Sequence, residues 1–138
     1  FFAGKRHMVS VSSSVYLGLY RLGFFVCVLA ISWLAFGSPP SNIAATVSDK
    51  ILHGIAFLVL AYLLSGALPA HSFWKVVLPV LLAYGFFIEL IQGQLSYRDF
   101  SLLDFAADAA GILCYWICHK PIWAISTFFL SEKEPSTI

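Results

Sequence analysis

The chain has 138 residues, of which 60% are hydrophobic and 11% are charged, and its formal net charge is +1. Soluble domains carry about 25% charged residues, so this composition is typical of a small polytopic membrane protein and argues against a soluble globular domain. The small net charge and the lack of a basic tract argue against nucleic-acid binding.

The first element in chain order is a short segment before the first apolar run. We expect residues 1–15 to form an N-terminal cytoplasmic segment. The only methionine is Met8, which leaves two interpretations open: the chain has been trimmed, or Met8 is the start and residues 1–7 are foreign. No small-residue cleavage site follows a short apolar core, which argues against a removed signal peptide.

Four apolar runs within residues 16–118 predict a bundle of four transmembrane helices, and therefore an all-α polytopic membrane protein. Each run is close to the roughly 20 residues that a helix needs to cross about 30 Å of hydrocarbon. Pro39 and Pro40 cannot continue a helix and end the first run. Pro79 lies inside the third run, where we expect a kink. The predicted helices cover approximately residues 16–36, 50–68, 73–91 and 102–118.

Residues 119–138 are expected to form a C-terminal interfacial segment and tail. The stretch from Pro121 to Leu130 is apolar but too short to span a bilayer. Trp123 suits the membrane boundary, where aromatic side chains are enriched. We therefore expect a separate short helix that lies in the interface.

The distribution of Lys and Arg predicts the orientation in the membrane. With four spans, both chain ends share one side with the loop between the second and third helices. Cytoplasmic loops carry an excess of Lys and Arg, so we expect the N- and C-termini to lie in the cytoplasm. The side of the chain ends holds Lys5, Arg6, Arg21, Lys75, Lys120 and Lys133, and the opposite side holds Lys50 and Arg98.

Most of the polar side chains within the apolar sequence gather, in this topology, at the outer face. The second and fourth helices begin there and the third ends there. Ionisable groups in a bilayer are costly, so we treat this cluster as a candidate ligand-binding site. It comprises Asp49, Lys50 and His53 in the second helix, Glu89 and Gln92 in the third, Arg98 in the following loop, and Asp104 and Asp108 in the fourth.

The ends of the predicted helices carry residues suited to local roles. Ser48 or Asp49 suits the N-cap of the second helix, and Ser101 suits that of the fourth, because their side-chain oxygens accept hydrogen bonds from free backbone amides. Alanines and Gly111 surround Asp108, and small residues let membrane helices approach closely.

The charge count of the cluster limits what it can bind. The cluster contains four carboxylates and only two side chains, those of Lys50 and Arg98, that are always cationic at neutral pH. A fully ionised cluster would therefore be net negative. Such a cluster must hold protons, recruit cations or bind a positively charged group. We assign no resident metal and no cofactor, since no zinc-type His spacing is present. Cys27, Cys114 and Cys118 are expected to pack against helices or lipid as small hydrophobic side chains.

The polar residues resemble the VanZ-like family of small bacterial membrane proteins, which is named for a teicoplanin-resistance protein. The resemblance covers residues 48–111, where order and spacing both match, and the first helix matches only in hydrophobicity. The matching elements are Asp49-Lys50-x-x-His53, Glu89-x-x-Gln92, Arg98, Ser101-x-x-Asp104 and Asp108-x-x-Gly111.

The resemblance implies a protein of the bacterial cytoplasmic (inner) membrane with a link to the cell envelope and to glycopeptide resistance. It brings no agreed catalytic activity. One position departs from the family pattern, which usually has Asn where this chain has Asp108. A carboxylic acid in place of an amide adds a possible charge, so any role carried over to this position is open.

Three functions stay open. The first is binding of a lipid-linked envelope ligand or a lipoglycopeptide, with Arg98 and Lys50 holding a phosphate or carboxylate and the acids holding an amine or a bridging divalent cation. The second is an accessory or structural subunit of a larger membrane complex, in which the cluster only fixes helix register. The third is an enzyme acting on a lipid-linked substrate, with His53 and Glu89 or Asp104 as base and acid. No candidate nucleophile has a clear catalytic base beside it, so we lean against an enzyme.

The expected binding partners are membrane lipids, the envelope ligand and a host complex, and no nucleic acid.

Overall fold

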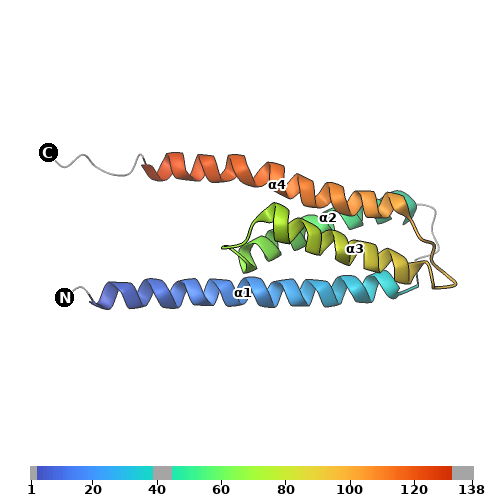
Figure 1. The fold of residues 1–138 in the computed structure, drawn as a ribbon, viewed down its shortest axis with the longest axis horizontal. Coiled ribbons are helices and arrows are strands. Elements are labelled where there is room, and N and C mark those ends of the chain that lie inside the picture. Colours follow the sequence, from blue (N-terminus) through green and yellow to red (C-terminus); the bar gives the residue numbers. More distant parts are fainter. Residues whose placement is uncertain (1–2, 39–44, 132–138) are drawn as a thin grey trace.

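The computed structural model describes the backbone of residues 3–38 and 45–131 and the side chains of residues 14–38 and 49–119. Within these ranges the regular structure is entirely helical (Figure 1), which confirms the predicted all-α class. The helices are α1 (Ala3–Phe36), α2 (Ala45–Ala67), a π-helical turn η1 (Phe73–Val77), α3 (Leu78–Gln92) and α4 (Leu102–Ser131).

Four segments in the described part of the chain are long and apolar enough to cross a membrane, which confirms the four predicted spans. They are Ser14–Phe36, Asp49–Ala67, Phe73–Gln92 and Leu102–His119. Both chain ends lie at one end of the bundle. The last turns of α1 and α3 and the first turns of α2 and α4 lie at the other, which we call the loop end (Figure 1).

Three helix boundaries differ from those predicted. The first helix begins at Ala3, so most of the predicted N-terminal segment continues α1. α2 begins at Ala45, so neither Ser48 nor Asp49 is its N-cap; alanine, the first residue of this helix, has the highest helix propensity. α4 continues to Ser131 through Pro121, where we predicted a separate helix. A proline removes only one backbone donor, and membrane helices tolerate it.

The irregularity predicted at Pro79 falls one turn earlier, in η1. The backbone N–H of Leu78 donates to the carbonyl oxygen of Phe73, five residues back, which is the π-helical pattern. Pro79 then occupies the first turn of α3. A proline there costs no hydrogen bond, because the first backbone N–H groups of a helix have no partner within it.

The hydrophobic core is centred on α2, which contacts α1 on one side and α4 on the other. Its buried side chains include Phe57 and Leu60, which pack with Leu81 and Ile88 of α3 and Ile112 of α4. All five side chains are at most 1% exposed. The outer faces of the helices carry large exposed hydrophobic side chains, as expected for surfaces that face lipid.

A close approach between helices joins the backbones of α2 and α4, which run parallel to each other (Figure 1). A Cβ atom added to Gly111 would overlap the carbonyl oxygen of Gly54 and lie 2.9 Å from its carbonyl carbon. A Cβ atom added to Gly54 would meet only the carbonyl oxygen of Ala107, at 3.6 Å, an ordinary contact. The contact therefore requires glycine at position 111 and tolerates a small side chain at position 54.

We therefore predict opposite outcomes for two matched substitutions. Gly111→Ala should lower the free energy of unfolding by about 1–3 kcal/mol, because the methyl group must push α2 away from α4. Gly54→Ala should leave it unchanged or raise it, by up to about 1 kcal/mol, since alanine is the better helix former. Reversible unfolding of both variants in mixed detergent micelles measures the difference. Equal destabilisation by the two substitutions would contradict the close backbone contact.

Candidate ligand-binding site at the loop end

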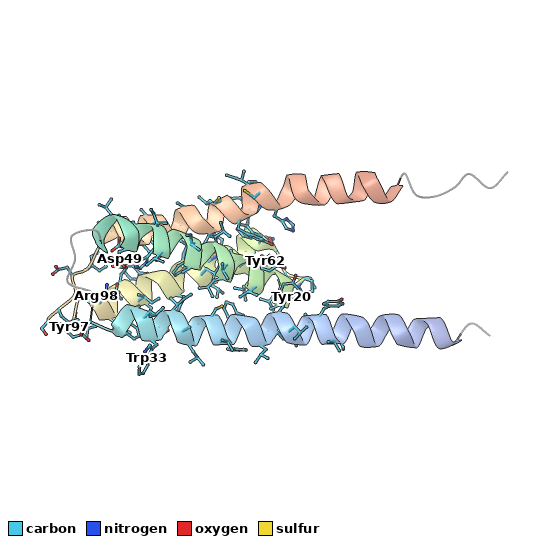
Figure 2. All side chains as sticks on the ribbon, turned by 180° about the vertical axis from the view of Figure 1, so that it is seen from behind. Tyr20, Trp33, Asp49, Tyr62, Tyr97 and Arg98 are labelled. Carbon is cyan, nitrogen blue, oxygen red and sulfur yellow. The ribbon has the colours of Figure 1, made fainter. Side chains whose placement is uncertain are left out.

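The eight candidate site residues all lie at the loop end of the bundle, as the topology predicted. Figure 2 shows Asp49 and Arg98 close together there, with Tyr97 beside them, whereas Tyr20 and Tyr62 lie toward the opposite end. The residues come from the first turns of α2 and α4, the last turns of α3 and the connection between α3 and α4.

Two polar pairs join α2 to α4. The ammonium group of Lys50 donates to Oδ1 of Asp104 at 2.6 Å. One turn deeper, Nδ1 of His53 lies 2.8 Å from Oδ1 of Asp108, whose side chain is fully buried. Both pairs lie between the loop end and the Gly54–Gly111 contact, so the three contacts form a ladder along two parallel helices. We call this set of three contacts the α2–α4 ladder.

Glu89 and Ser101 hold the start of α4. The backbone N–H of Ser101 donates to Oε2 of Glu89 at 2.9 Å. The hydroxyl oxygen of Ser101 accepts a hydrogen bond from the backbone N–H of Asp104 at 3.2 Å, which confirms Ser101 as the N-cap. A carboxylate and a hydroxyl thus satisfy backbone donors that the first turn of a helix leaves without partners.

Three side chains from the end of α3 and the following connection hold the end of α1. Gln92 donates to the carbonyl oxygen of Ala35 at 3.0 Å, and the hydroxyl of Tyr97 donates to that of Phe36 at 2.8 Å. Arg98 donates through Nε and Nη2 to the carbonyl oxygen of Gly37, at 3.4 and 3.3 Å. A cation is favourable at a helix C-terminus. Gln92 and Arg98, which we predicted as ligand-binding residues, therefore also cap α1.

Arg98 keeps one nitrogen directed toward α2. Its Nη1 atom lies 3.7 Å from Oδ2 of Asp49, which is an ion-pair distance but too long for a hydrogen bond. The side chain of Asp49 is 38% exposed and that of Arg98 is 15% exposed. Of the charged pairs described at the loop end, this is the most loosely held, and therefore the one that an incoming anion would displace at least cost.

Two buried carboxylate oxygens have no hydrogen-bond partner among the described residues. They are Oε1 of Glu89 and Oδ2 of Asp108. A Cβ atom added to Gly85 would lie 2.8 Å from Oδ2 of Asp108, so the glycine leaves the space that this carboxyl group fills. Buried polar atoms normally have partners, so these two oxygens mark places where a proton, a water molecule or a ligand group fits.

A cavity of about 160 Å³ lies at the loop end, between α1, α2 and α3. Its wall is mainly apolar and includes Ala56, Phe57 and Ile88. Asp49, His53, Gln92 and Arg98 supply polar groups to the same wall. Leu34 and Leu52 also line it, and they are 71% and 60% exposed on the outside of the bundle. The cavity therefore reaches the surface between α1 and α2 that would face lipid.

Three of the residues could also hold a cation. One ligand atom each from Asp49, His53 and Asp104 lies within 4.8 Å of the others. Two carboxylates and an imidazole suit a divalent cation such as Zn²⁺. The Lys50 ammonium already binds Oδ1 of Asp104, so a metal ion would have to share this carboxylate with it or displace it. The prediction that the protein holds no resident metal therefore stays a prediction.

Sequence reasoning missed Tyr97 and Gly85. Tyr97 comes shortly after an apolar helix, as many aromatic residues at membrane interfaces do. Nothing in the sequence shows that its hydroxyl group reaches α1. Gly85 lies among apolar residues of α3. Its position inside a predicted helix was the available signal, because an interior glycine lowers helix stability and often marks a close approach of another group.

A double-mutant cycle tests the deeper pair of the ladder. His53→Leu and Asp108→Leu should each lower the free energy of unfolding by about 1–3 kcal/mol, because each leaves one buried polar group without its partner. The double variant should lose at least about 1 kcal/mol less than the sum of the two single losses. Asp108→Asn should be milder, since an amide oxygen can still bond His53.

Asp99→Ala serves as the control for this cycle. Asp99 lies on the exposed connection between α3 and α4, and its loss should change stability by no more than about 0.5 kcal/mol. Strict additivity of the His53 and Asp108 substitutions would show that the two side chains are not coupled, and would contradict the ladder.

Comparisons with known proteins give no relative for this chain. No family model, no curated protein and no solved structure matches it. The resemblance of residues 48–111 to the VanZ-like family therefore stays a prediction from motif spacing, and the function has to be argued from the geometry of the loop end.

Proposed function

We propose that this chain is a VanZ-like protein of the bacterial cytoplasmic membrane that binds a lipid-linked envelope ligand at the loop end. The termini lie in the cytoplasm and the loop end faces outward. The observation that carries the proposal is the cavity beside His53 and Arg98, which joins an apolar wall to charged groups and reaches the lipid-facing side of the bundle. An amphipathic ligand has the same division into an apolar part and a charged part.

The size of the cavity limits which part of the ligand it holds. An engineered protein cavity of about 150 Å³ binds one benzene molecule. The cavity of about 160 Å³ therefore accepts a group of about one isoprene unit. The remainder of a long chain would lie along Leu34 and Leu52, outside the bundle and within the lipid. This division suits a prenyl chain whose first unit enters the protein.

The charged residues of the wall suit a phosphate. Arg98 is fixed by its two bonds to the Gly37 carbonyl oxygen, which leaves Nη1 directed toward Asp49. A phosphate oxygen placed there would replace the 3.7 Å contact with a charge-assisted hydrogen bond. His53 lines the same cavity and could donate a second bond. A lipoglycopeptide such as teicoplanin, with its acyl chain, presents the same combination of apolar chain and charged group.

Binding of farnesyl phosphate to the purified chain in nanodiscs tests the proposal. A ligand that binds the folded state stabilises it by about 2.7 kcal/mol at a concentration of one hundred times Kd. Ala56→Leu should abolish this stabilisation, because Ala56 lines the cavity and the larger side chain fills it. Ala83→Leu is the matched control, since Ala83 is exposed on α3 and does not line the cavity.

Two results would contradict the proposal. Farnesol could stabilise the protein as strongly as farnesyl phosphate, which would mean that Arg98 and His53 do not bind the phosphate group. Alternatively, Ala56→Leu could bind with unchanged affinity, which would place the ligand elsewhere on the protein.

The cellular part of the proposal predicts a selective resistance phenotype. Deletion of the gene should increase sensitivity to teicoplanin, and the wild-type gene and Ala83→Leu should restore tolerance. Ala56→Leu should fail to restore it at equal membrane abundance, because the cavity is filled. Sensitivity to vancomycin, scored separately, should change less, since that glycopeptide has no acyl chain. Full complementation by Ala56→Leu would separate the phenotype from the cavity.

A further inference from the structure

A second and larger cavity lies at the opposite end of the bundle from the loop end. It has a volume of about 640 Å³, is open to the surface, and is lined by residues of α1, α2, η1 and α4. Pockets that hold drug-sized ligands have volumes of about 300–1,000 Å³. Five aromatic rings line it, from Tyr20, Tyr62, Phe73, Tyr115 and Trp116. Figure 2 shows Tyr20 and Tyr62 facing each other across α1 and α2 at this place.

The rings of this cavity pack against one another. The hydroxyl oxygens of Tyr20 and Tyr62 lie 2.8 Å apart, and the ring centroids of Tyr62 and Tyr115 lie 6.3 Å apart in an edge-to-face contact. Phe73 stacks on Trp116, with 27° between the ring planes. The ring of Tyr20 also lies against Gly66, which leaves room for it. Mutual packing holds these rings as flat walls around the space.

The polar groups of the cavity wall include hydroxyl groups and imidazoles. Among the described residues, the wall contains no Asp, Glu, Lys or Arg. It contains the imidazoles of His71 and His119 and the side chain of Ser65, whose hydroxyl is buried without a hydrogen-bond partner. Imidazoles and hydroxyl groups both donate and accept hydrogen bonds. The wall therefore suits a ligand with hydrogen-bonding atoms and no net charge.

We propose that this cavity binds a neutral, planar ring compound that carries carbonyl or hydroxyl groups at its edge and an apolar tail, as membrane quinones do. The aromatic walls stack on the two faces of the ring. Tyr62 and His71 donate hydrogen bonds to its carbonyl oxygens, and the tail leaves the cavity toward lipid. The site is separate from the loop end, and the proposal does not depend on the envelope ligand.

The volume favours this ligand class over a quaternary ammonium group, which aromatic residues also bind. A cation–π cage holds the cation within about 6 Å of each ring centroid. A space of about 640 Å³ is too wide for one trimethylammonium group to touch all of the rings. A substituted ring with the first part of its tail fills such a space better.

Quenching of tryptophan fluorescence by decylubiquinone tests the site in nanodiscs of phosphatidylethanolamine and phosphatidylglycerol. The wild-type protein should show saturable quenching, because bound quinone lies beside Trp116. Tyr62→Phe and His71→Leu should each weaken the apparent affinity about five- to tenfold, which corresponds to the loss of one hydrogen bond. Trp33→Phe is the control: Trp33 is 83% exposed near the loop end, so its loss should reduce the linear background from quinone in the lipid and leave the saturable quenching unchanged.

Competition experiments identify the ligand class. Oxidised and reduced short-chain quinones should both displace decylubiquinone, whereas decanol and decyltrimethylammonium should not. Quenching that rises linearly with the quinone-to-lipid ratio in every variant would overturn the proposal. Displacement by decanol would show that only the tail is bound, and displacement by decyltrimethylammonium would show a cation cage. Either displacement also overturns it. Thermal unfolding of both variants without quinone checks that they fold like the wild type.

Discussion

The contact between the backbones of Gly54 and Gly111 sets the distance between α2 and α4, and the polar chemistry of the loop end depends on it. Aspartate has a short side chain, so Asp104 and Asp108 can reach Lys50 and His53 only if the two helices lie very close together. The two helices run in the same direction, so residues one turn apart on α2 meet residues one turn apart on α4. Small residues are the usual means of such close approach in membranes, where lipid provides no hydrophobic force between helices.

This arrangement uses much of the charge that the sequence places at the loop end. Lys50 and His53 are engaged by α4, Glu89 holds the first amide of α4, and Gln92 and Arg98 hold carbonyl oxygens of α1. The sequence predicted that a fully ionised cluster would be net negative and would have to hold protons, recruit cations or bind a positively charged group. In the structure, the charges are mostly arranged in pairs, so register between helices and ligand binding share the same residues. What stays available to a ligand is the loose contact of Asp49 with Arg98 and the cavity beside it.

The sequence predicted the parts of this architecture that follow from local pattern. The four spans follow from hydropathy, and the gathering of eight polar residues at one end follows because consecutive spans cross the membrane in opposite directions. The partners did not follow, because the acceptors on α1 are backbone carbonyl oxygens of Ala35, Phe36 and Gly37, which no side-chain motif marks. The close approach at Gly111 was expected only in general terms, since its neighbours are small as well. The length of α4 did not follow, because the stretch from Pro121 to Leu130 is too short to span a bilayer by itself and was expected to form a separate interfacial helix, whereas α4 continues through it.

The two cavities lie at opposite ends of the bundle, and the layer between them bears on the kind of function that the fold allows. Leu60, Ala61, Leu81 and Ile112 form that layer, and each side chain is 0% exposed. Interiors packed in this way leave few voids larger than a water molecule. This packed layer separates the cavity at the loop end from the aromatic cavity, so each of the two ligands that we propose would bind in a space of its own.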